Sequence, residues 1–258
     1  MMTLKKLQII IYKNKLEGIN MNKEIMEEKE YMKERINDII SRKPEAKEVC
    51  MEGLHLVLSF SNKKLTYDLS EKFLNSFHNY IFRDICIKLS GFALITEKFV
   101  EDLAEFIGDK KCLEIMSGLG CLSKSLIDKG VNVIPTDNYS WTNCFDMNTT
   151  WTDIENIDCL SAIEKYGKDV SYIICSWIPH DDNIGFKALK LMHEINPDCK
   201  MILIGEDWGS CTADDEFFNR CNIIDKSINK NFRQWNGIHD FAAVVEYSEE
   251  CIYSEDID

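Results

Sequence analysis

The stretch that decides the fold is "CLEIMSGLG", from Cys112 to Gly120. An apolar run typical of a buried strand carries one carboxylate, Glu114, and leads through Gly118 and Gly120 into a helix-like segment. Glycines at such a junction let the backbone approach a ligand closely, and the helix N-terminus offers free N–H groups. The stretch therefore predicts a ligand-binding turn between a strand and a helix.

Strand-like and helix-like segments alternate through the part of the chain around this turn. Thr96 precedes an amphipathic segment and Gly108 follows it, as expected of a helix N-cap and of the glycine just beyond a helix. Strands that alternate with helices of about ten residues are typical of a doubly wound, mostly parallel sheet with helices on both faces. We expect strands at 111–116, 131–137, 169–178, 200–206 and 237–247, and helices at 97–107, 121–129, 158–167 and 184–195.

The first ninety residues have a different, mainly helical pattern. Residues 23–43 carry apolar side chains at helical spacing, and Pro44 ends the pattern. The runs "LHLVLSF" at 54–60 and "KKLTYDL" at 63–69 favour a hairpin, and residues 70–89 favour a helix. We therefore divide the chain into an extension at 1–20 that we expect to be mobile, a helical cap or lid at 21–90, and a ligand-binding domain at 91–258.

Composition narrows the choice of partners. The 258 residues are 45% hydrophobic, enough for a sizeable core, and their formal net charge is −14. Duplex nucleic-acid binders use a basic face to contact phosphates, so a small molecule or a protein is favoured as the partner. Eleven scattered cysteines and five histidines lack metal-ligand spacing, so no metal is expected. Free thiols and the lack of about 18 consecutive apolar residues favour a cytoplasmic protein with no membrane span.

Two carboxylates indicate the class of ligand. Asp137 ends the strand that follows Gly120, where a carboxylate can accept both hydroxyls of a ribose. Glu114 would repel a pyrophosphate but attract a ligand with an ammonium and a sulfonium group. The pattern therefore predicts a pocket for a cationic, nucleoside-bearing cofactor.

These residues carry a resemblance to a known family. "LEIMSGLG" and "VIPTD" resemble motifs I and II of class I S-adenosylmethionine-dependent methyltransferases, with Met116 where the first glycine of motif I usually stands. "SWIPHDD" and "GEDWGSCTADDEFF" resemble segments of a group of uncharacterised bacterial and viral proteins. The resemblance implies a Rossmann-like sheet of seven strands whose last strand, 237–247, is antiparallel and pairs with "CNIIDKSI".

The resemblance also implies roles for individual residues. Glu114 would lie at the methionine end of S-adenosylmethionine, Asp137 would bind the ribose, and Asp158 and Cys159 would hold the adenine. The cofactor-binding residues implied in this way are Glu114, Met116, Ser117, Gly118, Gly120, Asp137, Asn138, Asp158, Cys159 and Ser176.

The ends of two further strands predict the acceptor side. Trp177, His180, Glu206 and Trp208 are candidate acceptor-binding residues, and His180 and Glu206 are also candidate catalytic residues, His180 as a general base. The alternative interpretation is structural. An exposed loop would hold His180, Asp181 or Asp182 would cap the next helix, Trp208 would wall the cofactor site, and Thr212 with Asp215 would start a helix. His239 and Asp240, at the start of the last strand, are expected to be structural.

Three kinds of function remain open. The resemblance favours methyl transfer from S-adenosylmethionine, with S-adenosylhomocysteine as product, to a small-molecule or peptide acceptor. The second class is a binding module that keeps the cofactor pocket without the chemistry, and a third reading is another transferase on the same cofactor, such as an aminopropyl transferase, or a nicotinamide enzyme. Ser176 and Trp177 stand where many family members carry an asparagine-containing motif, so an amino-group acceptor is not implied.

Overall fold

The computed structural model describes residues 23–140, 150–180 and 182–252, and the side chains from Tyr31 onward within those ranges. Its centre is a seven-stranded sheet in the order β3-β2-β1-β4-β5-β7-β6. The first five strands run parallel, and β7 is antiparallel to both of its neighbours. The predicted doubly wound sheet, including its antiparallel last strand, is confirmed. Residues 1–20 and Asp181 lie outside the described residues.

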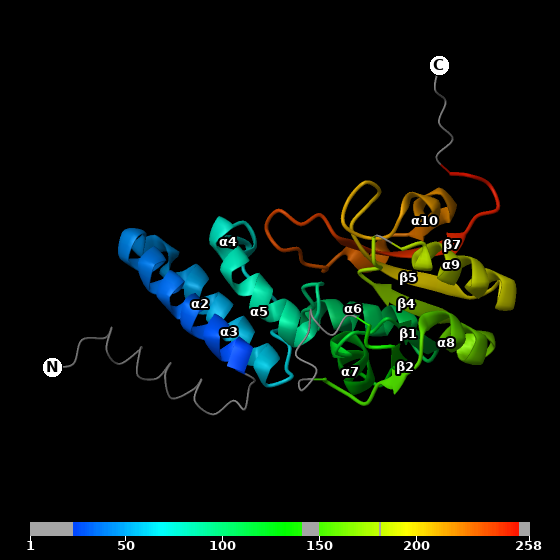
Figure 1. Cartoon of the computed structure of the whole chain (residues 1–258), viewed down its shortest axis with the longest axis horizontal. Helices are drawn as coiled ribbons and strands as arrows, with labels where there is room; N and C mark the ends of the chain where they lie inside the picture. The colour runs from blue at the N-terminus through cyan, green and yellow to red at the C-terminus, as the bar shows by residue number, and fades with distance from the viewer. Residues whose placement is uncertain (1–22, 141–149, 181, 253–258) are drawn as a thin grey trace, which may run out of the picture.

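The strands follow the sequence pattern closely. Each apolar run that was expected to form a parallel strand does so (Figure 1). The turn that contains Gly118 and Gly120, called the glycine turn below, begins directly after the first of these strands. The strands are β1 (Lys111–Ile115), β2 (Asn132–Asp137), β3 (Glu155–Asn156), β4 (Tyr172–Ser176), β5 (Lys200–Gly205), β6 (Cys221–Asp225) and β7 (Phe241–Tyr247).

Helices cover both faces because the strands are apolar on both sides. Ile174 and Ile202 pack in a core with the helices of one face, whereas Ile173 and Cys175 pack in the core of the other face. The first face is covered by α6 (Glu97–Ile107) and α7 (Cys121–Asp128). The second is covered by α8 (Cys159–Tyr166), followed by the short helix η5 (Gly167–Asp169), α9 (Ile184–Ile195) and α10 (Asp215–Arg220).

The N-terminal helices stand beside the sheet and extend the molecule in one direction (Figure 1). Phe73, Phe82 and Leu89 from these helices share one continuous apolar core with Phe99 of α6. They are therefore packed on the sheet domain. The elements are α2 (Lys23–Arg42), η1 (Pro44–Ala46), α3 (Lys47–Ser61), α4 (Glu71–Leu74), η2 (Phe77–Asn79) and α5 (Tyr80–Ser90). None of the helices in the described ranges is long and apolar enough to span a membrane.

Four local predictions were wrong. The expected hairpin at 54–69 is the second half of α3 and a loop, because Gly53, Leu56, Val57 and Phe60 fall at helical spacing and bury one face. The expected helix at 70–89 is divided into three, since Ser70 and Ser76 each cap a new start. Asp182 does not cap α9, whose N-cap Asn183 makes no side-chain capping bond, and α10 is capped by Asp214 rather than by Thr212.

The connection between β6 and β7, which includes η6 (Ser227–Asn229), ties the N-terminal helices to the sheet. Arg233 forms a two-point ion pair with Asp68, with both N–O distances 2.8 Å. This pairing holds the pKa of Asp68 well below its usual range. Trp235 is 2% exposed and packs on Phe73 of α4, with ring centres 6.2 Å apart. A segment late in the chain therefore fixes elements formed early in it.

Candidate functional site

The turn from β1 to α7 is held in an unusual backbone conformation. Met116, Gly118 and Gly120 all have positive φ, at 53°, 57° and 70°. A Cβ at Gly120 would lie 3.1 Å from side-chain atoms of both Thr152 and Ile154, so the close approach of that segment depends on a glycine here. Met116 stands where the resembled motif has a glycine, and it nevertheless adopts the left-handed conformation that a glycine would favour.

Glu114 lies beneath this turn and is only 2% exposed. One carboxylate oxygen accepts the backbone N–H of Ser123 at 3.0 Å and also the Ser123 hydroxyl, which links β1 to the first turn of α7. Burial raises the pKa of Glu114 from 4.5 to about 7, despite these two hydrogen bonds. A buried acid with this pKa next to a cavity is typical of a functional site.

Asp137 anchors the same turn from β2. Its carboxylate accepts the backbone N–H of Gly118 at 2.8 Å and that of Tyr139 at 2.6 Å. Burial raises its pKa. Each oxygen keeps a second acceptor position, so the carboxylate can still bind a hydroxyl of a ligand.

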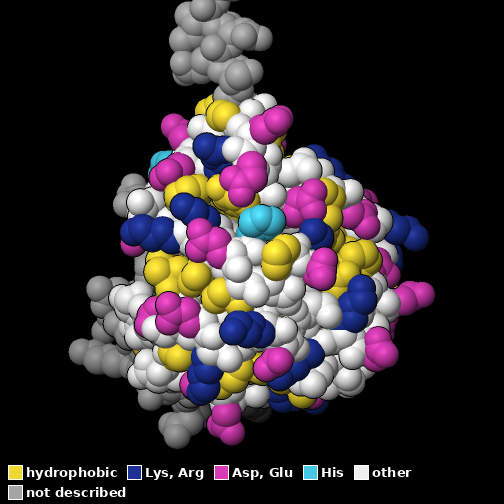
Figure 2. Space-filling view, turned by 90° about the vertical axis from the view of Figure 1, so that its right-hand side faces the viewer, with side chains coloured by type: hydrophobic (Ala, Val, Ile, Leu, Met, Phe, Trp, Pro, Cys, Tyr) yellow, Lys and Arg dark blue, Asp and Glu magenta, His cyan; other side chains and the backbone are white. Residues whose placement is uncertain are grey.

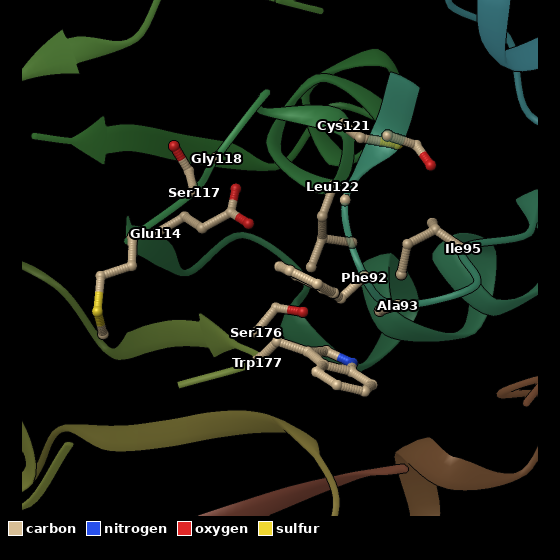
Figure 3. Close-up of a pocket in the computed structure, with 13 residues that line it drawn as sticks. Phe92, Ala93, Ile95, Glu114, Ser117, Gly118, Cys121, Leu122, Ser176 and Trp177 are labelled. Atoms are coloured by element: carbon tan, nitrogen blue, oxygen red, sulfur yellow. The ribbon is translucent and has the colours of Figure 1, made fainter. Parts of the chain in front are cut away.

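A cavity opens between this turn, the end of β4 and the segment that joins α5 to α6. Figure 3 shows the Glu114 carboxylate, the Ser176 hydroxyl and the rings of Phe92 and Trp177 turned toward the same space. Polar groups on one side and aromatic rings on the other are typical of a small-molecule site. The lining residues are Ser90, Gly91, Phe92, Ala93, Ile95, Glu114, Met116, Ser117, Gly118, Cys121, Leu122, Ser176 and Trp177.

Trp177 is held firmly in this lining. Its φ is 57°, a conformation rarely adopted by bulky residues. Its ring stacks on Phe92 at 5.3 Å with an interplanar angle of 20°, and its indole N–H donates to Asp240 at 3.2 Å. The side chain is therefore fixed by groups from two separate segments.

Half of the predicted cofactor residues meet at this cavity. Glu114, Met116, Ser117, Gly118 and Ser176 line it, while Gly120 and Asp137 shape the turn beside it.

The remaining predicted cofactor residues lie outside the lining. Asn138 closes a local turn by accepting the N–H of Ser140, Asp158 caps α8 through Leu160 and Ser161, and Cys159 is the buried first residue of α8. The adenine-binding role of Asp158 and Cys159 and the cofactor-binding role of Asn138 stay predictions.

Of the predicted acceptor residues, one lines the cavity and three do not. Trp177 lines the cavity. His180 is exposed, with Nδ1 2.6 Å from the carbonyl oxygen of Ala213, and Trp208 is 38% exposed and donates its indole N–H to Asp215 at 2.5 Å. Glu206 is buried, and its two carboxylate oxygens accept the N–H groups of Cys211 and His239. The structure does not bring these three side chains into the lining of the cavity.

Sequence reasoning missed the segment from Ser90 to Ile95, which forms one wall of the cavity. Gly91, with φ at 108°, is the one local signal of a sharp turn after α5, and it indicates no ligand. Asp240 was also missed as a partner of Trp177, because the two residues are 63 positions apart.

Figure 2 shows acidic and basic side chains interspersed on the face it displays. Within residues 23–140, 150–180 and 182–252, no cluster of three His, Cys, Asp or Glu side chains has the geometry of a metal site.

Comparison with known proteins gives matches of structure alone, since no family model and no curated sequence matches the chain. The structure of magnesium protoporphyrin IX methyltransferase from Synechocystis PCC 6803 with bound SAM is similar over 65% of this chain and 84% of that one, at 11% identity and a TM-score of 0.41. The similarity to the 1,6-didemethyltoxoflavin-N1-methyltransferase of Burkholderia thailandensis covers 59% of this chain and 80% of that one, at 12% identity and a TM-score of 0.38. The similarity to TehB from Haemophilus influenzae covers 64% of this chain and 67% of that one, at 16% identity and a TM-score of 0.39.

At these scores the likeness carries no argument about activity. The order of the strands and the antiparallel β7 carry the conclusion about the fold. The chain has a Rossmann-like α/β fold with a seven-stranded mixed sheet, and a polar and aromatic cavity lies at the carboxyl ends of β1 and β4.

Proposed function

We propose that this chain binds S-adenosylmethionine and transfers its methyl group to a small-molecule or peptide acceptor. The observation that carries the proposal is the buried Glu114 carboxylate beneath a left-handed glycine turn, at the carboxyl end of the first strand of a Rossmann-like sheet. An ammonium group suits such a site, whereas a pyrophosphate does not.

The residues around the cavity fit this cofactor. The Ser117 hydroxyl is buried, and it has no hydrogen-bond partner among the described residues. A buried polar atom without a partner is costly, and a ligand that bonds to it removes the cost. Gly118 lines the cavity with no Cβ, so its backbone is open to a ligand. Glu114 would pair with the ammonium, Ser117 would bond to the methionine end, and Asp137 would accept the ribose hydroxyls.

When bound, the cofactor supplies a methyl group already activated by its sulfonium. The chain therefore has mainly to position the acceptor and to exclude water. Phe92 and Trp177 form the apolar wall of the cavity, on the side away from the glycine turn (Figure 3). Ser176, at the end of β4, provides a hydroxyl at the same place.

The second candidate function is a cofactor-binding module without catalysis. It is favoured by one observation. His180 and Glu206, the residues expected to act as acid or base, are engaged by backbone groups and lie outside the cavity lining. Transfer of a labelled methyl group to an acceptor separates the two candidates, because the module would bind the cofactor and label nothing.

The cofactor class is tested by thermal unfolding. S-adenosylhomocysteine at a hundred times its Kd is expected to stabilise the chain by about 2.7 kcal/mol, because a ligand that binds only the folded state shifts the unfolding equilibrium. The midpoint temperature should rise with S-adenosylhomocysteine and stay unchanged with NAD. A rise with NAD alone would identify a nicotinamide site instead.

Asp137→Ala is expected to weaken S-adenosylhomocysteine binding by about 1.5–3 kcal/mol, the range for a hydrogen bond to a charged group. The substitution removes the ribose acceptor and also releases the N–H of Gly118. Calorimetry on the folded variant measures the loss. Asp153→Ala, on the exposed loop before β3, is the matched control and should bind as the unmodified chain does. Equal affinities for the two variants would exclude Asp137 from the site.

A further inference from the structure

The start of β7 lies at the same edge of the sheet as the end of β5. The two strands are antiparallel, and Phe241 of β7 stands opposite Gly205 of β5. Asp240, one residue before β7, therefore lies at the carboxyl edge of the sheet with Trp177, which follows β4. Their hydrogen bond of 3.2 Å is the result of this topology.

Asp240 is incompletely satisfied in this position. Its side chain is 0% exposed, and Oδ2 accepts the indole N–H of Trp177. Oδ1 is buried and has no hydrogen-bond partner among the described residues. Burial raises the pKa of Asp240 to about 7. A buried carboxylate oxygen without a donor is costly, so a ligand that supplies an N–H is favoured there.

Arg83 of α5 lies over the face of the same indole. Its guanidinium carbon is 5.8 Å from the ring centre, and its Nε is buried without a hydrogen-bond partner. Across the part of the chain that the structure describes, Arg83 has no carboxylate within the 4.0 Å of an ion pair. It is nevertheless near enough to Asp240 for its charge to lower the pKa of that acid.

Glu206, the other acid near Asp240, does not form an ion pair with Arg83. The two oxygens of Glu206 hold the backbone N–H groups of Cys211 and His239, so Glu206 braces the loop after β5 against the start of β7. Above the Asp240 pKa of about 7, Arg83 and Asp240 are opposite charges beside one indole, close enough to interact and too far apart to pair. Groups placed in this way can be satisfied together by one molecule that carries both charges.

We propose that Arg83 and Asp240 bind the two ends of a zwitterionic acceptor, a small amino acid-like molecule whose amine meets Asp240 and whose carboxylate meets Arg83. Trp177, held between them, would contact the carbon chain. The assignment deepens the proposed function and rests on it for the acceptor role, but binding is measured without any turnover. It also departs from the structural role that the sequence predicted for Asp240.

The test is an NMR titration in saturating S-adenosylhomocysteine. The indole N–H resonance of Trp177, assigned by its loss in Trp177→Phe, reports on Asp240 directly. The probes are glycine, β-alanine, γ-aminobutyrate and ε-aminocaproate, each compared with the alkylamine and the alkanoate of equal length. One zwitterion is expected to bind at least about tenfold more tightly than both of its singly charged analogues, as expected for an added charged hydrogen bond.

The variants assign each charge. Asp240→Asn should reduce that zwitterion to the affinity of its alkanoate, and Arg83→Gln should reduce it to that of its alkylamine. Both variants should retain S-adenosylhomocysteine binding within about twofold. The controls are Asp84→Asn, exposed beside Arg83 on α5, and Lys187→Gln, exposed on α9, and neither should change the titration.

Three results would overturn the proposal. The first is that no zwitterion binds better than its singly charged analogues. The second is that the two variants leave the preference intact. The third is that they weaken S-adenosylhomocysteine instead, which would assign the pair to the methionine end of the cofactor. Failure of S-adenosylhomocysteine to bind the unmodified chain would instead count against the proposed function, and the titration is then repeated without it.

Discussion

Glu114→Gln is expected to weaken S-adenosylhomocysteine binding about a hundredfold or more at pH 8, or ~3 kcal/mol. Removal of one partner of a buried ion pair leaves the other charge uncompensated, which is among the largest effects of a single substitution. The glutamine retains the shape of the side chain and one oxygen that can accept from Ser123. The variant should therefore fold, and calorimetry should assign the loss to the missing charge.

The pH dependence gives this prediction a second measurement. The Glu114 pKa of about 7 means that a proton must leave before the carboxylate can pair with an ammonium group. Affinity in the unmodified chain should therefore rise with pH up to about 7, roughly tenfold per unit, and then level off. Glu114→Gln should lose this dependence. The exposed Glu216→Gln on α10 is the control and should keep it.

The contribution of Glu114 to folding stability should fall as pH rises, whereas its contribution to affinity should increase. The pKa of Glu114 is raised on folding, so its contribution is fully present below the unfolded value of 4.5 and is lost as pH rises to about 7. The ligand-free Glu114→Gln variant should therefore be at least as stable as the unmodified chain at pH 8, by urea unfolding. A variant that is less stable and binds normally would place Glu114 in a purely structural role.

Trp235→Ala is expected to lower the free energy of unfolding by about 3–5 kcal/mol, the range for deletion of a large buried aromatic side chain. Trp235 is 2% exposed and packs on Phe73, so its removal opens a cavity between the β6–β7 connection and α4. Urea unfolding followed by circular dichroism measures the loss.

Phe77→Ala is the matched control, because Phe77 is 73% exposed in the same region. Its effect should stay within about 0.5 kcal/mol. A loss below about 1 kcal/mol for Trp235→Ala would mean that the N-terminal helices do not depend on this contact.

The sheet domain could be predicted from sequence because its signals are local and repeated. Thr96 and Gly108 bound α6 as expected, and each apolar run that alternates with a helix forms a strand. The N-terminal part was harder because an apolar run of seven residues fits a strand or a buried helix equally well, and α3 is such a helix. Its Gly53 fits a helix packed closely on Phe82, a contact that only the tertiary structure reveals.

In the candidate site, too, residues of a local motif could be predicted and residues that meet through tertiary packing could not. Glu114, the glycine turn and Asp137 were predicted, because they follow one another in a short motif. Phe92, Arg83 and Asp240 could not be predicted, since each reaches Trp177 from a distant part of the chain and has no pattern of its own. The residues of the glycine turn can therefore be predicted from a local motif, whereas the surroundings of Trp177 depend on how distant segments pack.

The ion pair between Arg233 and Asp68 spans 165 positions of sequence, and this has a consequence for the order of events at the ribosome. The N-terminal helices emerge first, but Asp68 cannot pair with Arg233, and Phe73 cannot pack on Trp235, until those two late residues have been synthesised. Trp177 likewise waits for Asp240. Contacts this distant in sequence form slowly and leave apolar surface exposed in the meantime. A nascent chain stalled before β7 should therefore need a chaperone, and the contact between Trp177 and Asp240 should be among the last to form.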